Sequence, residues 1–368
     1  MSSSAKFVLF KPSTPIPPGE TLNAVLKERG ISQAELANRM QRPKKFINEI
    51  IHAKAAITPE TALQLEVVLG VPSRFWNSLE SSYRDILIRE DEKNIKSKEV
   101  DAGKQFPYAE MLRLGWVPAA NSMQERISFL QQYFGATSLT SVSLLEALPK
   151  GLYRIAKVNN YSIPAINAWA RKGVIDGQKI QTQEFSKVKL IDSLNDIRAL
   201  TTQNDLPKAL KALRLILSDC GIAFVLTREI SKAPINGITR WLTPSKALLQ
   251  LSIRYKWEDV FWFSLFHEIG HILQHPKSEM QIELGTGPSL HPDYEVEADN
   301  FAKNTLIPPV DYASLVDHLK SGVKKDTIVS FANKINVSPA IVVGRLQHDH
   351  KIDFRIFNDL RRRIIWKN

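Results

Sequence analysis

WEDVFWFSLFHEIGHILQH, residues 257–275, is the stretch on which the interpretation of this 368-residue chain depends. Nine of the residues from 260 to 273 are large and apolar, and apart from one serine the polar ones are His267, Glu268 and His271. A helix that is apolar nearly all round is buried in a protein core. Each unpaired polar group buried there would cost about 2 kcal/mol or more. These side chains therefore need a compensating partner, and a metal ion would supply one.

Helical geometry brings the two histidines to one point. Four residues at about 100° each place His271 within roughly 40° of His267, and Glu268 projects beside them. The pattern His-Glu-x-x-His is typical of a helical zinc site with an adjacent general base. We therefore predict that His267 and His271 bind Zn²⁺ and that Glu268 is the catalytic base. The alternative is a chance match, in which two core histidines bond to backbone carbonyls and the glutamate reaches solvent.

The third ligand is expected from the acidic stretch DYEVEADNFA, residues 293–302, because a catalytic zinc takes three protein ligands. Glu295 and Asp299 are four residues apart and so share one face of a helix. We predict that Glu295 binds the metal and that Asp299 accepts a hydrogen bond from a ligating imidazole, which fixes the tautomer of that ring. Ala298 and Ala302 are small enough to let this helix approach the metal helix closely.

Other polar residues near these motifs are weaker candidates. Glu297 lies on a different helix face from Glu295 and is the reserve ligand. His275 follows His271 by one turn, but three ligands in a row along one helix diverge in angle, so a structural role is expected for it. Peptide hydrolysis also needs a partner for the oxyanion. For that role the sequence leaves three residues open: His291, Tyr294 and His348.

The segment before the metal helix predicts a small sheet. An amphipathic helix is expected at 208–219, and strand-like stretches follow at 221–227, 237–242 and 247–253. A small sheet packed on a helix with this motif is the upper half of a zincin, where an edge strand usually holds the substrate backbone by strand addition. Residues 238–242 or 248–253 are expected to serve as that edge.

Three of these stretches resemble a known family. The run ITRWL (238–242), the helix end FHEIGHILQH (266–275) and the stretch EVEADNFAKNTLIP (295–308) are similar to the ImmA/IrrE family of metallopeptidases. The resemblance spans about residues 208–308. It implies a zinc-dependent endopeptidase whose substrate is a DNA-bound repressor, often fused or adjacent to a helix-turn-helix domain.

The first 95 residues predict five short helices. Helical spacing covers residues 19–29, and Ser32-Gln-Ala-Glu35 is a capping box for the second helix. The third helix follows Pro43, the fourth opens at Thr58, and the fifth starts near Ser73. A basic third helix that carries an asparagine is typical of a helix-turn-helix, whose recognition helix offers its N-terminal side chains to base edges.

The stretch SQAELANRMQRPKKFINEIIHAKAAITPETALQLEVVLGVPSRFWNSLE, residues 32–80, resembles the HigA-like branch of the Xre helix-turn-helix proteins. Those proteins are antitoxins and autorepressors of toxin–antitoxin systems. The resemblance implies these DNA-facing residues: Gln33, Arg42, Lys44, Lys45 and Asn48. Two turn positions that usually hold glycine are Gln41 and Ala53 here, where a left-handed conformation is somewhat strained. A helical dimerisation or docking module that has lost DNA binding is the alternative.

Composition limits the class of protein. The net charge of +11 and the pI near 9.5 favour a polyanionic partner, such as double-stranded DNA. A single cysteine, Cys220, excludes an internal disulfide and fits a reducing compartment. No segment approaches the length of a membrane span, and the N-terminus lacks the apolar stretch of a signal peptide. We therefore expect a cytoplasmic protein that makes no membrane contact.

The expected fold class is mainly α with a small β-sheet (α+β). The polar, mixed-charge residues 93–105 are interpreted as a linker. Further helices are expected at 108–114, 123–133, 165–171, 185–200, 310–319, 327–335, 339–347 and 353–366. The expected domains are a helix-turn-helix at 1–95, a helical connecting or sensing region at 96–205, a zincin-like core at 206–308 and a helical extension at 309–368.

Two functional hypotheses follow. The first is a DNA-binding transcriptional regulator with a zinc endopeptidase domain that cuts a repressor protein at or near an operator. The second is a non-catalytic, antitoxin-like regulator that binds DNA and a HigB-like toxin and has only a structural metal. Either could form a homodimer. Glu268 distinguishes them, because a structural site needs no base beside an open coordination position.

Overall fold

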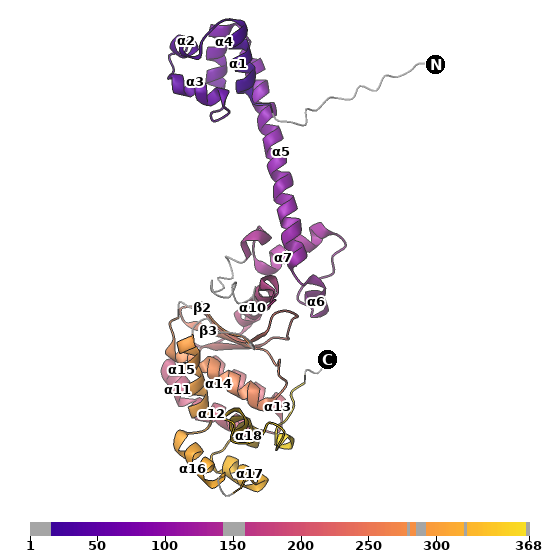
Figure 1. The fold of residues 1–368 in the computed structure, drawn as a ribbon, viewed down its shortest axis with the longest axis vertical. Helices are drawn as coiled ribbons and strands as arrows, with labels where there is room; N and C mark the ends of the chain where they lie inside the picture. The colour runs from indigo at the N-terminus through magenta and orange to yellow at the C-terminus, as the bar shows by residue number, and fades with distance from the viewer. Residues whose placement is uncertain (1–15, 143–158, 278–279, 285–291, 320–321, 366–368) are drawn as a thin grey trace, which may run out of the picture. The chain divides into compact units, whose positions relative to one another are not determined.

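The computed structural model describes residues 16–142, 159–277, 280–284, 292–319 and 322–365. The chain forms two compact units, residues 1–98 and 99–368. Most described residues are helical, and four strands form one small mixed sheet (Figure 1). The predicted α+β class is therefore confirmed. Within the second unit, the middle region and the zincin-like segment are parts of one compact body.

The first unit consists of short helices around one apolar core. The helices are α1 (Pro18–Glu28), α2 (Gln33–Arg39), α3 (Lys44–Ile51), α4 (Pro59–Leu69) and the start of α5 (Ser73–Gln105). Their buried core includes Leu22, Leu36, Ile47, Ile50, Leu65 and Trp76. As expected, the Ser32 and Thr58 hydroxyls cap α2 and α4, accepting from the Glu35 and Thr61 N–H groups at 3.1 and 3.2 Å.

The two turns that flank α3 use the left-handed conformation at non-glycine residues. Gln41, before the helix, has φ 52°, and Ala53, after it, has φ 56°. The sequence comparison with the HigA-like pattern anticipated both, because glycine is usual at these positions. Each turn therefore keeps its geometry at some conformational cost.

The boundary between the two units falls within residues 93–105, as expected of a linker. These residues are not irregular chain, however, because α5 runs without a break from Ser73 to Gln105. The end of α5 is also held in place. The Glu99 carboxylate accepts from the Leu139 N–H at 2.9 Å and from the Ser138 hydroxyl, and Gly103 lies against Ile127.

The second unit begins with helices that precede the sheet. They are α6 (Tyr108–Arg113), α7 (Met123–Phe134), η1 (Leu139–Ser141), α10 (Ile163–Lys179), α11 (Lys187–Asp192), α12 (Leu194–Ala199), η2 (Leu200–Thr202) and α13 (Leu206–Asp219). The helix expected at 185–200 is divided at Ser193, which ends α11. The Tyr133 hydroxyl donates to the Ala168 carbonyl at 2.8 Å and ties α7 to α10.

The sheet lies between α10 and the metal helix α14 (Glu258–Gln274) (Figure 1). Its strands are β1 (Ile222–Leu226), β2 (Ile235–Thr243), β3 (Lys246–Leu251) and β4 (Gln281–Leu284), in the order β1-β3-β2-β4. Strands β1 and β3 are parallel, and the other pairs are antiparallel. Ile238 packs with Trp169 of α10 on one face, whereas Leu249 packs with Leu265 of α14 on the other.

The expected edge strands are wrong. Both 238–242 and 248–253 fall on interior strands, because β2 lies between β3 and β4, and β3 lies between β1 and β2. In the described part of the chain, β1 and β4 are the edges. Strand β4 escaped sequence analysis because four residues, QIEL, are too short for a periodic signal.

The remaining helices extend the core around the metal helix. They are α15 (Pro292–Leu306), α16 (Pro309–Leu319), α17 (Lys325–Lys334) and α18 (Pro339–His348). Of these, α15 and α18 are the ones that contact it. The helix expected at 353–366 is wrong, since only the short η3 (Asn358–Leu360) forms there. Arginines of this segment instead form ion pairs with acidic residues in the first turn of α14. Arg361 pairs with Asp259 at 2.8 Å and Arg362 with Glu258.

We expect Arg361→Ala to lower the free energy of unfolding by about 3 kcal/mol, because it leaves the buried Asp259 carboxylate without its partner. The side chains of Arg361 and Asp259 are 12% and 8% exposed. Chemical denaturation followed by tryptophan fluorescence would measure the change. The exposed Arg355→Ala is the matched control and should stay within about 0.5 kcal/mol of the unsubstituted chain. Equal effects of the two substitutions would contradict the expectation.

Candidate metal centre

Two helices form the site, and small residues let them approach each other. A methyl group added to Gly270 of α14 would lie 3.2 Å from the Ala298 Cα of α15 and 3.1 Å from the Phe301 ring. Ala298 and Ala302 are fully buried at this contact, as expected from their size. The close approach brings the first turns of α15 against the His-Glu-x-x-His face of α14.

Three predicted ligands meet in the structure: His267, His271 and Glu295. The two Nε2 atoms of His267 and His271 are 3.0 Å apart. The Glu295 carboxylate oxygens lie 3.2 Å from Nε2 of His267 and 3.7 Å from Nε2 of His271. Ligands about 2.0 to 2.1 Å from a tetrahedral ion are separated by about 3.3 Å. The three donors therefore have a spacing that fits zinc, and Glu297 does not take the ligand position.

Asp299 orients one of the rings. Its Oδ1 accepts a hydrogen bond from Nδ1 of His267 at 3.0 Å, which leaves Nε2 free to face the other donors. Burial lowers the pKa of His267, but hydrogen bonds to Asp299 and Glu295 outweigh burial and raise this pKa to about 11. The carboxylates around the ring therefore favour a positive charge at this point, as a bound cation would provide.

His271 is oriented in a different way, through His275. Its Nδ1 lies 2.7 Å from Nδ1 of His275, and Nε2 of His275 lies 3.2 Å from a Glu297 oxygen. If Nε2 of His271 is the ligand, Nδ1 of His271 donates to His275, and His275 donates in turn to Glu297. Tyr294 stacks on His275, with ring centroids 4.2 Å apart. His275 therefore has the expected structural role. Glu297 acts on the site indirectly, through its hydrogen bond with His275.

Glu268 lies inside the core beside the donors. It is fully buried, and burial raises its pKa well above the ordinary value. Neither of its oxygens has a hydrogen-bond partner of good geometry among the described residues, although the Thr239 side chain is close enough to lower its pKa. A methyl group on Gly237 of β2 would lie 2.0 Å from Oε1 of Glu268, so only glycine leaves room for this carboxylate. A base for a reacting water needs acceptor oxygens that are not already occupied, next to the atoms that ligate the metal, and Glu268 provides them.

Glu283, which sequence analysis missed, is half-buried, and its Oε2 atom is fully buried. This residue lies on β4 and accepts from Nδ2 of Asn236 at 3.0 Å. Burial raises its pKa, whereas the charge of His267 lowers it. No spacing in the sequence marks this residue, because pairing of the short β4 with β2 is what brings it to the site.

The three oxyanion candidates have different surroundings. His291 lies outside the described residues. Tyr294 is stacked on His275, and His348 is 65% exposed and bonded to Asp349 at 3.0 Å. The role of an oxyanion partner stays a prediction for each of them.

The predicted DNA-facing residues lie around α3 in the first unit. Lys44, Lys45 and Asn48 are exposed on this helix, and Gln33 is half-buried at the start of α2. Arg42 is less free, because it pairs with Glu60 at 2.5 Å and bonds to Gln64 of α4. Three of the five predicted side chains are therefore exposed on one short helix, α3.

The fold and the site define a helix-turn-helix protein that also carries a candidate metal centre of the zincin type. Residues 22–76 match the helix-turn-helix family, and residues 254–347 match the IrrE N-terminal-like domain, a peptidase family. The chain belongs to the helix-turn-helix transcriptional regulators and has an ImmA/IrrE-like peptidase domain in the same polypeptide. The helix-turn-helix interpretation and the resemblance to the ImmA/IrrE family are thereby confirmed.

Curated relatives match a short part of the chain. The uncharacterized HTH-type transcriptional regulator YddM of Escherichia coli K12 is 32% identical over 66 residues, which are 18% of this chain and 70% of that protein. Virulence-associated protein A of Dichelobacter nodosus is 33% identical over 77 residues, 20% of this chain and 76% of that protein.

Solved structures of antidote proteins are also similar. One is a putative antidote protein of a plasmid maintenance system from Nostoc punctiforme, 28% identical, covering 22% of this chain and 88% of that one, with a TM-score of 0.21. Another is a HigA-family addiction module antidote protein from Coxiella burnetii, 28% identical, covering 23% and 94%, also with a TM-score of 0.21.

Among the described helices, none is both long enough and apolar enough to cross a bilayer.

We expect about one zinc ion per purified chain, and its loss in both His267→Ala and Glu295→Ala, because each removes one of three ligands. Asp299→Asn should weaken zinc affinity about 10- to 100-fold, since it disturbs the orientation of the His267 ring. Elemental analysis and competition with a chelating dye would measure content and affinity. Asp293→Asn, an exposed aspartate on the same helix, is the control. Full zinc content in His267→Ala would contradict the assignment.

Proposed function

We propose that this protein is a transcriptional regulator that binds an operator and uses a zinc-dependent endopeptidase domain to cut a repressor-type protein in the cytoplasm. The observation that carries the proposal is Glu268. Its buried oxygens have no hydrogen-bond partner of good geometry among the described residues and lie beside three donors with the spacing of a zinc site. Such an arrangement is costly unless a ligand and a reacting water complete it.

The number of protein ligands also favours a catalytic metal site over a structural one. Structural zinc sites are closed by four protein ligands, whereas catalytic sites have three and an open position. Within the described residues, the cluster contains three donor side chains. The antitoxin-like alternative, in which the metal only stabilises the fold, gives no reason for a buried carboxylate next to that cluster.

In the proposed reaction, His267, His271 and Glu295 hold the metal, and Glu268 handles protons. Zinc bound at such a site supplies Lewis acidity, which polarises the scissile carbonyl and lowers the pKa of water to about 7. Glu268 takes a proton from the attacking water and returns it to the leaving amine. The raised pKa of Glu268, caused by burial, suits a group that must hold a proton between these two transfers. Asp299 and His275 keep the two imidazole rings in place.

The substrate backbone is proposed to pair with the free edge of β4. This strand is an edge of the described sheet and carries Glu283, whose charge acts on His267. A peptide added there as a further strand would run next to the metal centre.

We expect Glu268→Gln to keep zinc but to lose at least about 100-fold in the cleavage rate of a repressor from the same cell, because the proton acceptor is gone. Cleavage would be followed by gel electrophoresis and intact mass, with Glu184→Gln as an exposed control. Residual cleavage equal to that of the unsubstituted protein would contradict the proposal. Operator or toxin binding untouched by Glu268→Gln, with no repressor cut by either form, would favour the antitoxin-like alternative.

We expect the double substitution Lys44→Ala, Lys45→Ala to weaken binding to all DNA duplexes about equally and to reduce the slope of log affinity against log salt by about 2, since each lysine neutralises about one phosphate. Asn48→Ala should instead relax sequence preference at one base pair, by about 1 to 3 kcal/mol. Fluorescence anisotropy with selected duplexes would measure both. Lys98→Ala, an exposed lysine on α5, is the control. An unchanged salt slope in the double variant would contradict the proposed interface.

A further inference from the structure

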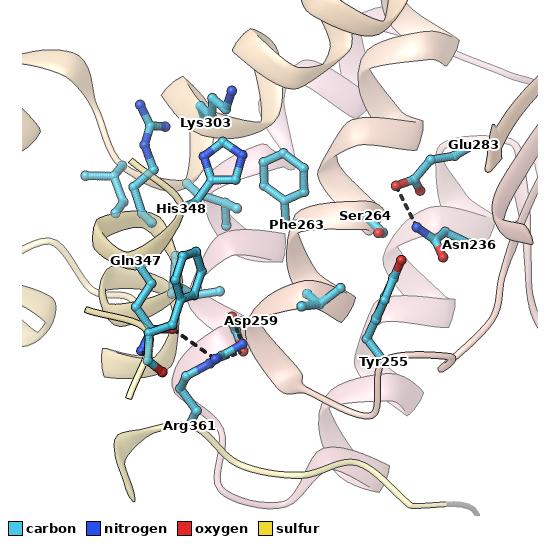
Figure 2. A pocket seen from close by; sticks show the side chains of 17 residues that line it. Asn236, Tyr255, Asp259, Phe263, Ser264, Glu283, Lys303, Gln347, His348 and Arg361 are labelled. Atoms are coloured by element: carbon cyan, nitrogen blue, oxygen red, sulfur yellow. Dashed lines mark hydrogen bonds and ion pairs between the residues drawn. The ribbon is translucent and has the colours of Figure 1, made fainter. Parts of the chain in front are cut away.

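A cavity of about 510 Å³ lies against the part of α14 that precedes the His-Glu-x-x-His motif (Figure 2). Val260, Phe263 and Ser264 of α14 line it, and they precede His267 by seven, four and three residues, so all four lie on one face of the helix. The Phe263 ring centroid is 6.3 Å from that of His267. A side chain of a peptide held at the metal centre can therefore reach this cavity. Its volume is within the usual range for ligand pockets.

One wall of the cavity contains hydrogen-bond acceptors to which no described group donates. Asn236 is 8% exposed, and its Nδ2 donates to Oε1 of Glu283 at 3.0 Å. This hydrogen bond fixes the orientation of the amide, so Oδ1 of Asn236 is left over as an acceptor. Oδ1 of Asn236 and Oε2 of Glu283 are buried and have no hydrogen-bond partner in the part of the chain that the structure describes. Figure 2 shows both side chains together, beside Ser264.

The basic side chains of the other walls already have partners. The pairs are Arg361 with Asp259 at 2.8 Å, Arg345 with Asp349 at 2.6 Å and Lys303 with Asp299 at 3.6 Å. His348 also contacts Asp349, at 3.0 Å, and is 65% exposed. The unmatched group of the cavity is therefore the Glu283 carboxylate, together with the Asn236 oxygen. Both groups call for a donor, and a cationic donor would also offset the cost of burying the carboxylate.

Much of the remaining lining is apolar and suits a long aliphatic stem. It includes Val260, Phe263, Leu306, Ile307 and Ile341. Lysine and arginine combine such a stem with a charged end that donates hydrogen bonds. A neutral apolar side chain would leave the two buried acceptors without a donor, which is unfavourable. An acidic side chain would meet basic groups that already have carboxylate partners.

We propose that this cavity is the specificity pocket of the peptidase, and that it takes the lysine or arginine side chain of the substrate residue next to the cut bond. The stem lies against Val260 and Phe263, and the cationic end binds Glu283 and Asn236. This inference rests on the proposed endopeptidase function and adds to it the chemical class of the residue that is recognised.

The first test is cleavage-site profiling with the zinc-loaded full chain. The probe is a mixture of peptides from a bacterial lysate digested with a protease that cuts after acidic residues, and mass spectrometry identifies the residues that flank each new end. We expect lysine or arginine to be enriched about tenfold at one flanking position, as a charged hydrogen bond of about 1.5 kcal/mol implies. Glu283→Gln should remove that enrichment, and Glu283→Lys should favour acidic residues instead. Glu184→Gln, an exposed glutamate, should leave it unchanged.

The second test does not depend on turnover. Saturation-transfer NMR would compare N-acetyl-arginine methylamide with the norleucine and glutamate analogues on the zinc-loaded full chain. We expect the arginine probe to bind about tenfold more tightly than either analogue and to lose this advantage in Glu283→Gln. If Glu283→Gln does not fold or does not retain zinc, Val260→Phe tests the same pocket. It fills the cavity without touching the carboxylate, and it should abolish both the enrichment and the binding.

The outcomes separate the pocket from the proposed function. Peptide cleavage without a preference for basic residues, or with a preference that survives Glu283→Gln or Val260→Phe, overturns the pocket and leaves the endopeptidase standing. Binding of the arginine probe that depends on Glu283, with no peptide or repressor cut, supports the pocket and overturns the endopeptidase. Equal binding of all three probes, with no cleavage, overturns both.

Discussion

Burial of three polar side chains in α14 is the constraint on which the rest of the second unit depends. His267, Glu268 and His271 are each at most 2% exposed. Desolvation of such groups is unfavourable unless neighbours compensate it. The compensation comes from α15, which brings Glu295 and Asp299 to the imidazoles. It can do so only because small residues lie where α14 and α15 contact each other.

The site brings several carboxyl groups together in a poorly solvated region. Besides the two carboxylates of α15, the fully buried Glu268 and the β4 residue Glu283 act on His267. Like charges at such short range repel one another strongly in a medium of low dielectric constant. A divalent cation at the three donors would relieve this repulsion, which gives a physical reason for metal binding to accompany folding of this region.

The elements around the metal helix are arranged to hold it in place. The sheet packs on one side, and Gly237 leaves room for the Glu268 carboxylate. At the start of α14, Glu258 and Asp259 are held by two consecutive arginines near the C-terminus. Buried ion pairs of this kind contribute little to stability on balance, but breaking one is costly, so they favour one arrangement of the segments.

The sequence by itself determined the elements whose signal is local. The spacing of two histidines and three carboxylates predicted three ligands, the base and the partner of His267, because helical periodicity places residues four apart on one face. Capping residues and apolar spacing likewise predicted the helices of the first unit. Only the tertiary structure decided which strands are edges, that residues 93–105 continue a helix, and that the C-terminal arginines bind α14. It alone also brought Glu283, Asn236 and the chain from His271 to Glu297 to the site. Apart from the helical continuation, these features depend on contacts between segments far apart in the sequence, which local periodicity does not encode.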